Sequence, residues 1–253
     1  MLAADGFFSQ NGIGNFGFRW LHILAGITWI GLLYYFNFVQ VPAFAQYEQH
    51  EGGARARNIT VDKLATKALW YFRWAAISTF VTGILITLIT KDYFSNGFGK
   101  SSGGIAISTG MLLGTIMMLN VWGVIWRNQK VVIANARNVQ AGGEADPAAA
   151  ECGRKALLAS RQNTIFSLPM LVFMVGTSHF PYDAFKPLSG GTRGTYWAIT
   201  IVVWLLFELN ALGVIGGFKP GGINAMYDTH RNTLITGFVY ALFVVVIYAL
   251  VLG

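Results

Sequence analysis

The chain has 253 residues, of which 54% are hydrophobic and only 11% are charged, and its mean hydropathy is +0.50. A soluble domain carries roughly 25% charged residues, so this composition excludes an ordinary soluble enzyme and indicates an integral membrane protein. The net charge of +7 does not indicate nucleic-acid binding, because the basic residues fall between apolar segments rather than on one face interleaved with aromatic residues.

Six apolar segments are long enough to cross a bilayer as helices, which takes about 20 residues each. We therefore expect an all-α, polytopic membrane helix bundle forming a single domain over residues 1–253. The first segment is not a signal peptide, because its apolar run is about twice the usual 7–15 residues of such a signal. The predicted spans are residues 18–44, 68–90, 104–126, 163–180, 195–217 and 232–252.

The basic residues predict the orientation of the bundle. The side holding the loops after spans 1, 3 and 5 has twelve of them, and the opposite side has five. Basic loops stay in the cytoplasm, so both termini are expected in the periplasm of a bacterial inner (cytoplasmic) membrane.

The largest polar insertion, residues 127–161, is predicted to be a cytoplasmic helical hairpin between spans 3 and 4. Gly142 and Gly143 end its first helix, while Asp146 caps the second helix and Pro147 opens it. The hairpin is either a solvated extension of the bundle or a docking site for a partner subunit.

Two histidines mark the predicted outer ends of their spans. His22 lies on a stripe of the first span that also contains Gly26, Trp29, Leu33, Phe36 and Gln40 and should face inward. His179 closes the fourth span at a similar depth. Such a pair can ligate the iron of a b-type haem; alternatively, each imidazole is hydrogen-bonded to a neighbouring carbonyl. Cys152 is the only cysteine, so no Cys-x-x-Cys-His motif for covalent haem c is present.

Glu208 is the acidic residue placed deepest in an apolar segment, ~13 Å from the cytoplasmic end of its span at 1.5 Å per residue. Such a carboxylate must be protonated, paired or facing water. Arg73 is its natural partner, although an arginine reaching toward the headgroups among Trp70, Tyr71 and Trp74 is an equal alternative.

Amide side chains gather in the cytoplasmic halves of the predicted spans. They describe either a polar cavity for a small, planar, hydrogen-bonding ligand or a network that only joins the helices. These residues are Asn37, Gln40, Asn120, Asn163 and Asn210.

Four stretches of the chain resemble the membrane domain of the PuuD-type urate-oxidising (urate hydroxylase) proteins. They are RWLHILAGITWIGLLYYFNFVQVPAF at 19–44, ALWYFRWAA at 68–76, NVWGVIWRNQKVVI at 120–133, and ASRQNTIFSLPMLVFMVGTSHF at 159–180. In that family the membrane domain is associated with urate oxidation and continues into a haem c domain. The Cys-x-x-Cys-His motif of such a domain is absent from this sequence. His22 to Trp29 followed by LLYY is also similar to the first helix of HemJ-type protoporphyrinogen oxidases, where a histidine is associated with haem b.

The resemblance implies a membrane redox protein that oxidises urate or a similar purine and passes electrons to a separate periplasmic cytochrome c. Glu208 would then be the proton acceptor or substrate anchor, and Arg73 the partner of an anionic substrate. Asn37, Gln40, Asn120 and Asn210 would bind the substrate, while His22 and His179 would bind haem b. The alternative is a non-catalytic accessory subunit of a larger membrane complex. A transporter is a third class, although no short broken helices indicate one. In each case the expected surroundings are membrane lipid, with no nucleic acid.

Overall fold

The structure, a computed structural model, describes residues 10–89, 92–95, 97–181 and 183–252. Its regular elements there are helices, with one isolated bridge between Ser101 and Pro187. The all-helical prediction is therefore confirmed for the described part of the chain.

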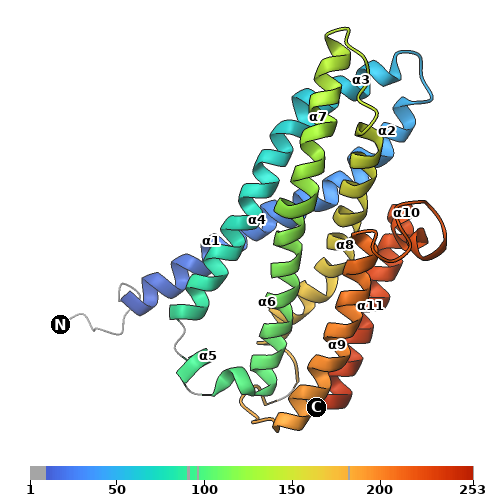
Figure 1. The fold of residues 1–253 in the computed structure, drawn as a ribbon. Helices are drawn as coiled ribbons and strands as arrows, with labels where there is room; N and C mark the ends of the chain where they lie inside the picture. Colours follow the sequence, from blue (N-terminus) through green and yellow to red (C-terminus); the bar gives the residue numbers. More distant parts are fainter. Residues whose placement is uncertain (1–9, 90–91, 96, 182, 253) are drawn as a thin grey trace.

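Six long helical rods make up the bundle (Figure 1). Each of the first three rods contains a π-helical turn within an otherwise α-helical run. Rod 1 is α1 (Gln10–Tyr34), η1 (Tyr35–Gln40) and α2 (Val41–Tyr47); rod 2 is α3 (Gly53–Thr60), η2 (Val61–Ala65) and α4 (Thr66–Ile89); rod 3 is α6 (Ser102–Asn120), η4 (Val121–Ile125) and α7 (Trp126–Gln140). The other rods are α8 (Ala149–Gly176), α9 (Gly190–Ala211) and α11 (His230–Leu252). Short helices α5 (Asp92–Ser95), η3 (Phe98–Lys100), η5 (Gly222–Asn224) and α10 (Ala225–Asp228) lie in the connections.

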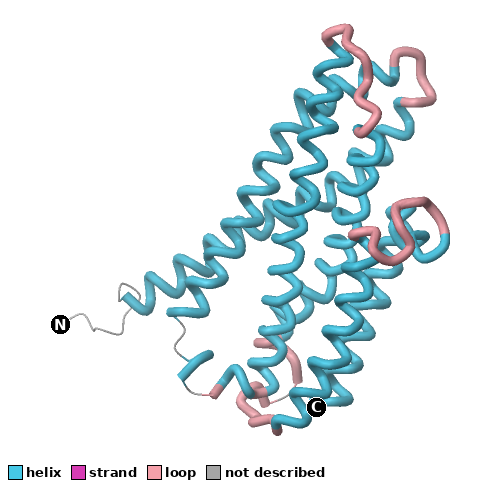
Figure 2. Tube along the Cα trace, viewed as in Figure 1, coloured by secondary structure: helices cyan, strands magenta, loops and turns pink. Residues whose placement is uncertain are grey.

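Successive rods run in opposite directions, so the connections gather at two ends (Figure 2). The connections after rods 1, 3 and 5 lie toward one end, and those after rods 2 and 4 lie at the other. The beginning of α1 and the end of α11 both lie at the second end (Figure 1). This alternation agrees with the predicted six-helix topology. Which end faces the cytoplasm stays a prediction.

Five of the six rods are long and apolar enough to cross a membrane: Gly12–Tyr47, Gly53–Ile89, Ser102–Gln140, Gly190–Ala211 and His230–Leu252. The exception is α8, where we predicted a span at 163–180. Its polar run from Arg161 to Thr164 interrupts the apolar sequence, and its first turns are charged. Because α8 packs against α6, α7 and α11, protein rather than lipid surrounds that run, which makes the polar residues tolerable.

The predicted hairpin at 127–161 is present as α7, a turn and the beginning of α8. Gly142 has φ +86°, a backbone conformation that glycine adopts readily. Asp146 Oδ1 accepts a hydrogen bond from the Ala148 backbone N–H at 2.8 Å. Because α8 begins at Ala149, Asp146 and Pro147 lie in the turn before the helix and do not cap and open it as predicted. The hairpin packs on the second rod, because Arg137 Nε lies 2.6 Å from Asp62 Oδ1.

The first two rods pack against each other along α1 and α4. Toward the end where α1 begins, this pair leans away from the other rods (Figure 1). The predicted inward stripe of the first rod is confirmed at its centre, where Trp29, Leu33 and Phe36 are buried, whereas His22 and Gln40 are half-buried. The stripe therefore faces the protein core only over part of its length.

Candidate functional site

The most polar part of the buried interior is a short run on α8. Arg161, Gln162, Asn163 and Thr164 are each at most 3% exposed. This run is flanked by η1 and by η4, both of which contact α8. A π-helical turn adds a residue to the helix and is frequent at functional sites. Asn37 lies inside η1, and Asn120 directly precedes η4.

Glu208 is held by amides of this region. Asn120 Nδ2 donates to Glu208 Oε2 at 3.1 Å and to Asn163 Oδ1 at 3.1 Å. Asn163 Nδ2 in turn donates to the Met117 carbonyl at 2.9 Å. The carboxylate thus joins α9 to α6 and α8 at a half-buried position. A carboxyl group in such a place, with neutral hydrogen-bonding partners, can accept or release a proton.

Tyr227, on α10, contacts the other half of the polar run. Its hydroxyl donates to Gln162 Oε1 at 2.6 Å, with the Phe207 carbonyl at 3.2 Å. Burial raises the pKa of the Tyr227 phenol, and the nearby Glu208 carboxylate raises it further. The phenol therefore stays protonated and keeps its role as a donor.

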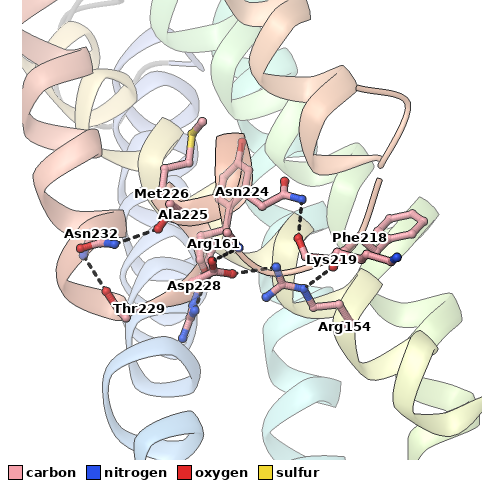
Figure 3. A network of polar contacts seen from close by, with 12 residues as sticks. Arg154, Arg161, Phe218, Lys219, Asn224, Ala225, Met226, Asp228, Thr229 and Asn232 are labelled. Carbon is pink, nitrogen blue, oxygen red and sulfur yellow. Dashed lines mark hydrogen bonds and ion pairs between the residues drawn. The ribbon is translucent and has the colours of Figure 1, made fainter. Parts of the chain in front are cut away.

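Arg161 lies against the backbone of α10. Its Nη1 donates to the carbonyl of Tyr227. Arg154, two turns earlier on α8, donates to the Phe218 carbonyl at 2.8 Å and pairs with Asp228 at 2.8 Å (Figure 3). Asn224 Nδ2 donates to the Lys219 carbonyl at 2.9 Å. These bonds fix the glycine-rich loop between α9 and α10 over the end of the polar run.

Several buried polar atoms in this region have no hydrogen-bond partner in the described part of the structure. Leaving such an atom unpaired costs about 1–3 kcal/mol. Both donors and acceptors are represented, so a ligand or water molecule that satisfied them would need both kinds of group. The atoms are Arg161 Nε, Gln162 Nε2, Asn37 Oδ1, Gln40 Oε1, Asn210 Oδ1 and Asn224 Oδ1.

The structure does not form the predicted pair between Arg73 and Glu208. The Arg73 guanidinium lies over the Trp126 ring, 3.8 Å from its centroid. No ion pair of Glu208 is present among the described residues, where its carboxylate instead accepts from Asn120. Arg73 is on α4, which packs on α1, α6 and α7. The position of Arg73 among aromatic residues agrees with the alternative to the ion pair, although the aromatic partner is Trp126.

The four predicted substrate-binding amides fall into two groups. Asn120 and Asn210 lie near Glu208, and Asn210 Nδ2 approaches the Ile223 carbonyl at 3.4 Å. Asn37 and Gln40 lie on the first rod, where Asn37 Nδ2 donates to Ser160 Oγ at 2.8 Å. The set therefore flanks α8 from two sides.

The two predicted haem ligands belong to different surroundings. His22 Nδ1 is 3.1 Å from Thr82 Oγ1 on α4, and its ring lies against Gly83, where an added Cβ would be 3.2 Å from Cε1. His179 is exposed after the end of α8, with Nδ1 2.9 Å from the Val175 carbonyl. In the described part of the structure, no hydrogen bond joins the two rings. Each ring therefore has a local hydrogen-bond partner at Nδ1, as the alternative of separately hydrogen-bonded histidines expects. Ligation of a haem by the two histidines stays a prediction.

Open volume is found at the opposite end of the bundle. A cavity of about 330 Å³ is lined by Tyr93, Ser108, Met111 and Trp197 among others. A second, of about 320 Å³, is lined by Phe98, Lys100, Phe185 and Arg193 among others. The residues given as lining these two cavities include none of the amide cluster.

Comparison with known families agrees with the sequence resemblance. Residues 99–206 match the family model described as urate oxidase N-terminal. The matched segment is less than half of the chain. It contains α6, α7, α8 and most of α9, with Asn120 and the whole polar run, and it ends two residues before Glu208. No curated protein and no solved structure matches the chain.

Sequence reasoning missed Arg161, Gln162 and Tyr227 as members of the cluster. Arg161 falls among the basic residues of a predicted loop, because the predicted span begins at residue 163. The available signal was the run Arg161-Gln162-Asn163 at the very edge of an apolar segment. Tyr227 gave no signal, because its contact with Gln162 joins residues 65 positions apart.

Proposed function

We propose that this chain is the membrane domain of a urate-oxidising system in a bacterial inner membrane. The observation that carries the proposal is the urate oxidase N-terminal match over the segment that contains the buried polar run. Urate or a similar purine is the substrate, and it binds beside α8, between Asn120, Glu208 and the residues of the run.

The chemistry of a purine supports this placement. A purine presents alternating donors and acceptors around a planar ring, and the cluster offers unpaired donors at Arg161 and Gln162 and an unpaired acceptor at Asn210. Specificity for such a ligand comes from polar groups that are left unpaired when it is absent.

Glu208 is the proposed proton acceptor. Removal of two electrons and two N–H protons from urate gives a dehydrogenated purine, to which a water molecule then adds at a ring carbon. The Glu208 carboxylate takes one of the two protons, and water carries the other. The electrons leave to a separate cytochrome c, two molecules of which accept one electron each. Asn120 keeps the Glu208 carboxylate oriented through the bond at 3.1 Å.

The experiment is urate-dependent reduction of cytochrome c by the purified protein in detergent, with a reduced-minus-oxidised absorption spectrum of the same preparation. Urate-dependent reduction that disappears in Glu208→Gln supports the proposal. Absence of reduction by a folded preparation contradicts it.

A second candidate is a non-catalytic accessory subunit. The observation that favours it is the mutual hydrogen bonding of Asn120, Asn163 and Glu208, beside which neither cavity lies. Co-purification of other membrane polypeptides, together with the absence of urate oxidation, would select this function.

A further inference from the structure

Arg161 is a buried cation without a carboxylate of its own. It is 3% exposed, its Nη1 donates to a backbone carbonyl, and its Nε has no partner. Asp228 is close enough to act electrostatically on Arg161, but its carboxylate forms an ion pair with Arg154 at 2.8 Å and accepts from the Gly221 N–H at 2.7 Å. Two guanidinium groups therefore share one carboxylate, which leaves one positive charge in excess.

An excess buried charge is costly unless an anion compensates it. Guanidinium is the side-chain group best suited to an anion with two acceptor atoms in one plane, because its donors form a fixed fork. Arg161 retains part of this fork, since Nε is free.

Other unpaired polar atoms of the same region restrict which anions could bind at Arg161. Gln162 Nε2 is a further unpaired donor, whereas Asn210 Oδ1 and Asn224 Oδ1 are unpaired acceptors. A phosphate or sulfate offers acceptors almost exclusively and would leave both asparagine oxygens unpaired. A heterocyclic anion that carries ring N–H groups beside carbonyl oxygens can satisfy both kinds of atom.

The loop between α9 and α10 covers this place. Gly213, Gly216, Gly217, Gly221 and Gly222 all have positive φ, and Arg154 fastens the loop through Phe218 and Asp228 (Figure 3). Because Arg161 is almost fully covered, a ligand reaches it only when this loop moves. Glycines in such numbers lower the cost of that movement.

We propose that Arg161 and Gln162 bind the anionic edge of a planar heterocyclic anion of the urate type beneath the loop between α9 and α10. The choice of urate as ligand rests on the proposed function; the anion site itself rests on the burial and hydrogen bonding of Arg161.

The test measures binding by calorimetry on the full chain in detergent, with urate, hypoxanthine and inorganic phosphate as probes. Urate is an anion at neutral pH and hypoxanthine is neutral. Arg161→Gln should weaken urate binding by about tenfold or more, as expected for loss of a hydrogen bond to a charged group, and should change hypoxanthine binding far less. Arg161→Lys, which keeps the charge, should lose less than Arg161→Gln. The exposed Arg127→Gln removes the same charge elsewhere and should bind urate like the unmodified protein.

Unchanged urate affinity in folded Arg161→Gln overturns the proposal. So does equal loss of urate and hypoxanthine binding, no urate binding by the unmodified protein, or phosphate competing with urate at equal concentration. If Arg161→Gln does not fold, Arg161→Lys is used instead. The proposal is then overturned if Arg161→Lys binds urate with unchanged affinity and the unmodified protein binds urate and hypoxanthine with equal affinity.

The two proposals fail separately. Arg161-dependent urate binding without cytochrome c reduction contradicts the enzymatic function and leaves this site standing. Urate oxidation by Arg161→Gln with an unchanged KM contradicts the Arg161 site and leaves the enzymatic function standing.

Discussion

The Asn120 side-chain amide donates to the Glu208 carboxylate at 3.1 Å and so joins the end of α6 to α9. The same amide nitrogen also donates to Asn163 on α8. One asparagine therefore holds three rods together at the carboxylate that we propose as the proton acceptor.

Asn120→Asp should destabilise the protein by about 1–3 kcal/mol, because it removes both donated bonds and places a second carboxyl group beside Glu208. Thermal unfolding in detergent measures the effect. Asn128→Asp is the control, since Asn128 donates within its own rod, to the Val124 carbonyl. Equal melting temperatures of the two variants would contradict the central role of Asn120.

Glu208→Gln should reduce urate turnover far more than it reduces the amount of folded protein. The substitution keeps shape and one acceptor oxygen for Asn120 but removes the group that takes the proton. Turnover and membrane abundance are measured on the same preparations. Normal turnover at low abundance would make the residue structural and would favour the accessory-subunit alternative.

Arg73→Gln and Glu208→Gln should have additive effects on the free energy of unfolding, within about 0.5 kcal/mol, because the two residues share no contact. Arg73→Gln by itself removes the interaction with Trp126, which contributes about 0.5–2 kcal/mol. A double-mutant cycle provides the measurement. A large coupling energy would restore the ion pair that the sequence predicted.

Gly83→Ala should destabilise the α1–α4 pair by about 1–3 kcal/mol, because the new methyl group would lie 3.2 Å from His22 Cε1. Gly31→Ala provides the control, since nothing lies within 4 Å of the added Cβ there. The melting temperatures of the two variants are compared. If they are equal, the His22 ring has room to move and is not held by Thr82.

Arg154→Gln should speed chymotrypsin cleavage at Phe218 several-fold, because Arg154 fastens the loop through both Phe218 and Asp228. Arg137→Gln removes a pair with Asp62 on the second rod, away from this loop, and should leave cleavage unchanged. Equal cleavage of both variants would mean that the loop is held in another way.

Thiol labelling of single-cysteine variants in a Cys152→Ser background measures the orientation of the bundle in the membrane. A cysteine at Gly143 should react only from the cytoplasmic side, and one at Lys186 only from the periplasmic side, given the unequal distribution of basic residues. Reaction of both from the same side would exclude the six-rod topology. The reverse pattern would invert the orientation and remove the argument for a periplasmic electron acceptor.

The sequence by itself determined the helical membrane bundle and the hairpin at 127–161. Length and apolarity suffice for the first, and the local conformational preferences of Gly142 and Asp146 suffice for the second. The sequence also placed Glu208, Asn120 and Asn210 in one half of the bundle, since residue counting along a helix gives depth.

Only the tertiary structure decided which of these residues meet. The sequence gives only the depth of a residue along its helix. Arg73 and Glu208 can lie at a similar depth and still face different neighbours. The sequence counted Arg161 as part of a loop, because an arginine at the edge of an apolar segment resembles the boundary of a span. Its burial depends on α10, whose Tyr227 carbonyl accepts from Arg161 across 66 positions of the chain, and no local pattern encodes such a contact.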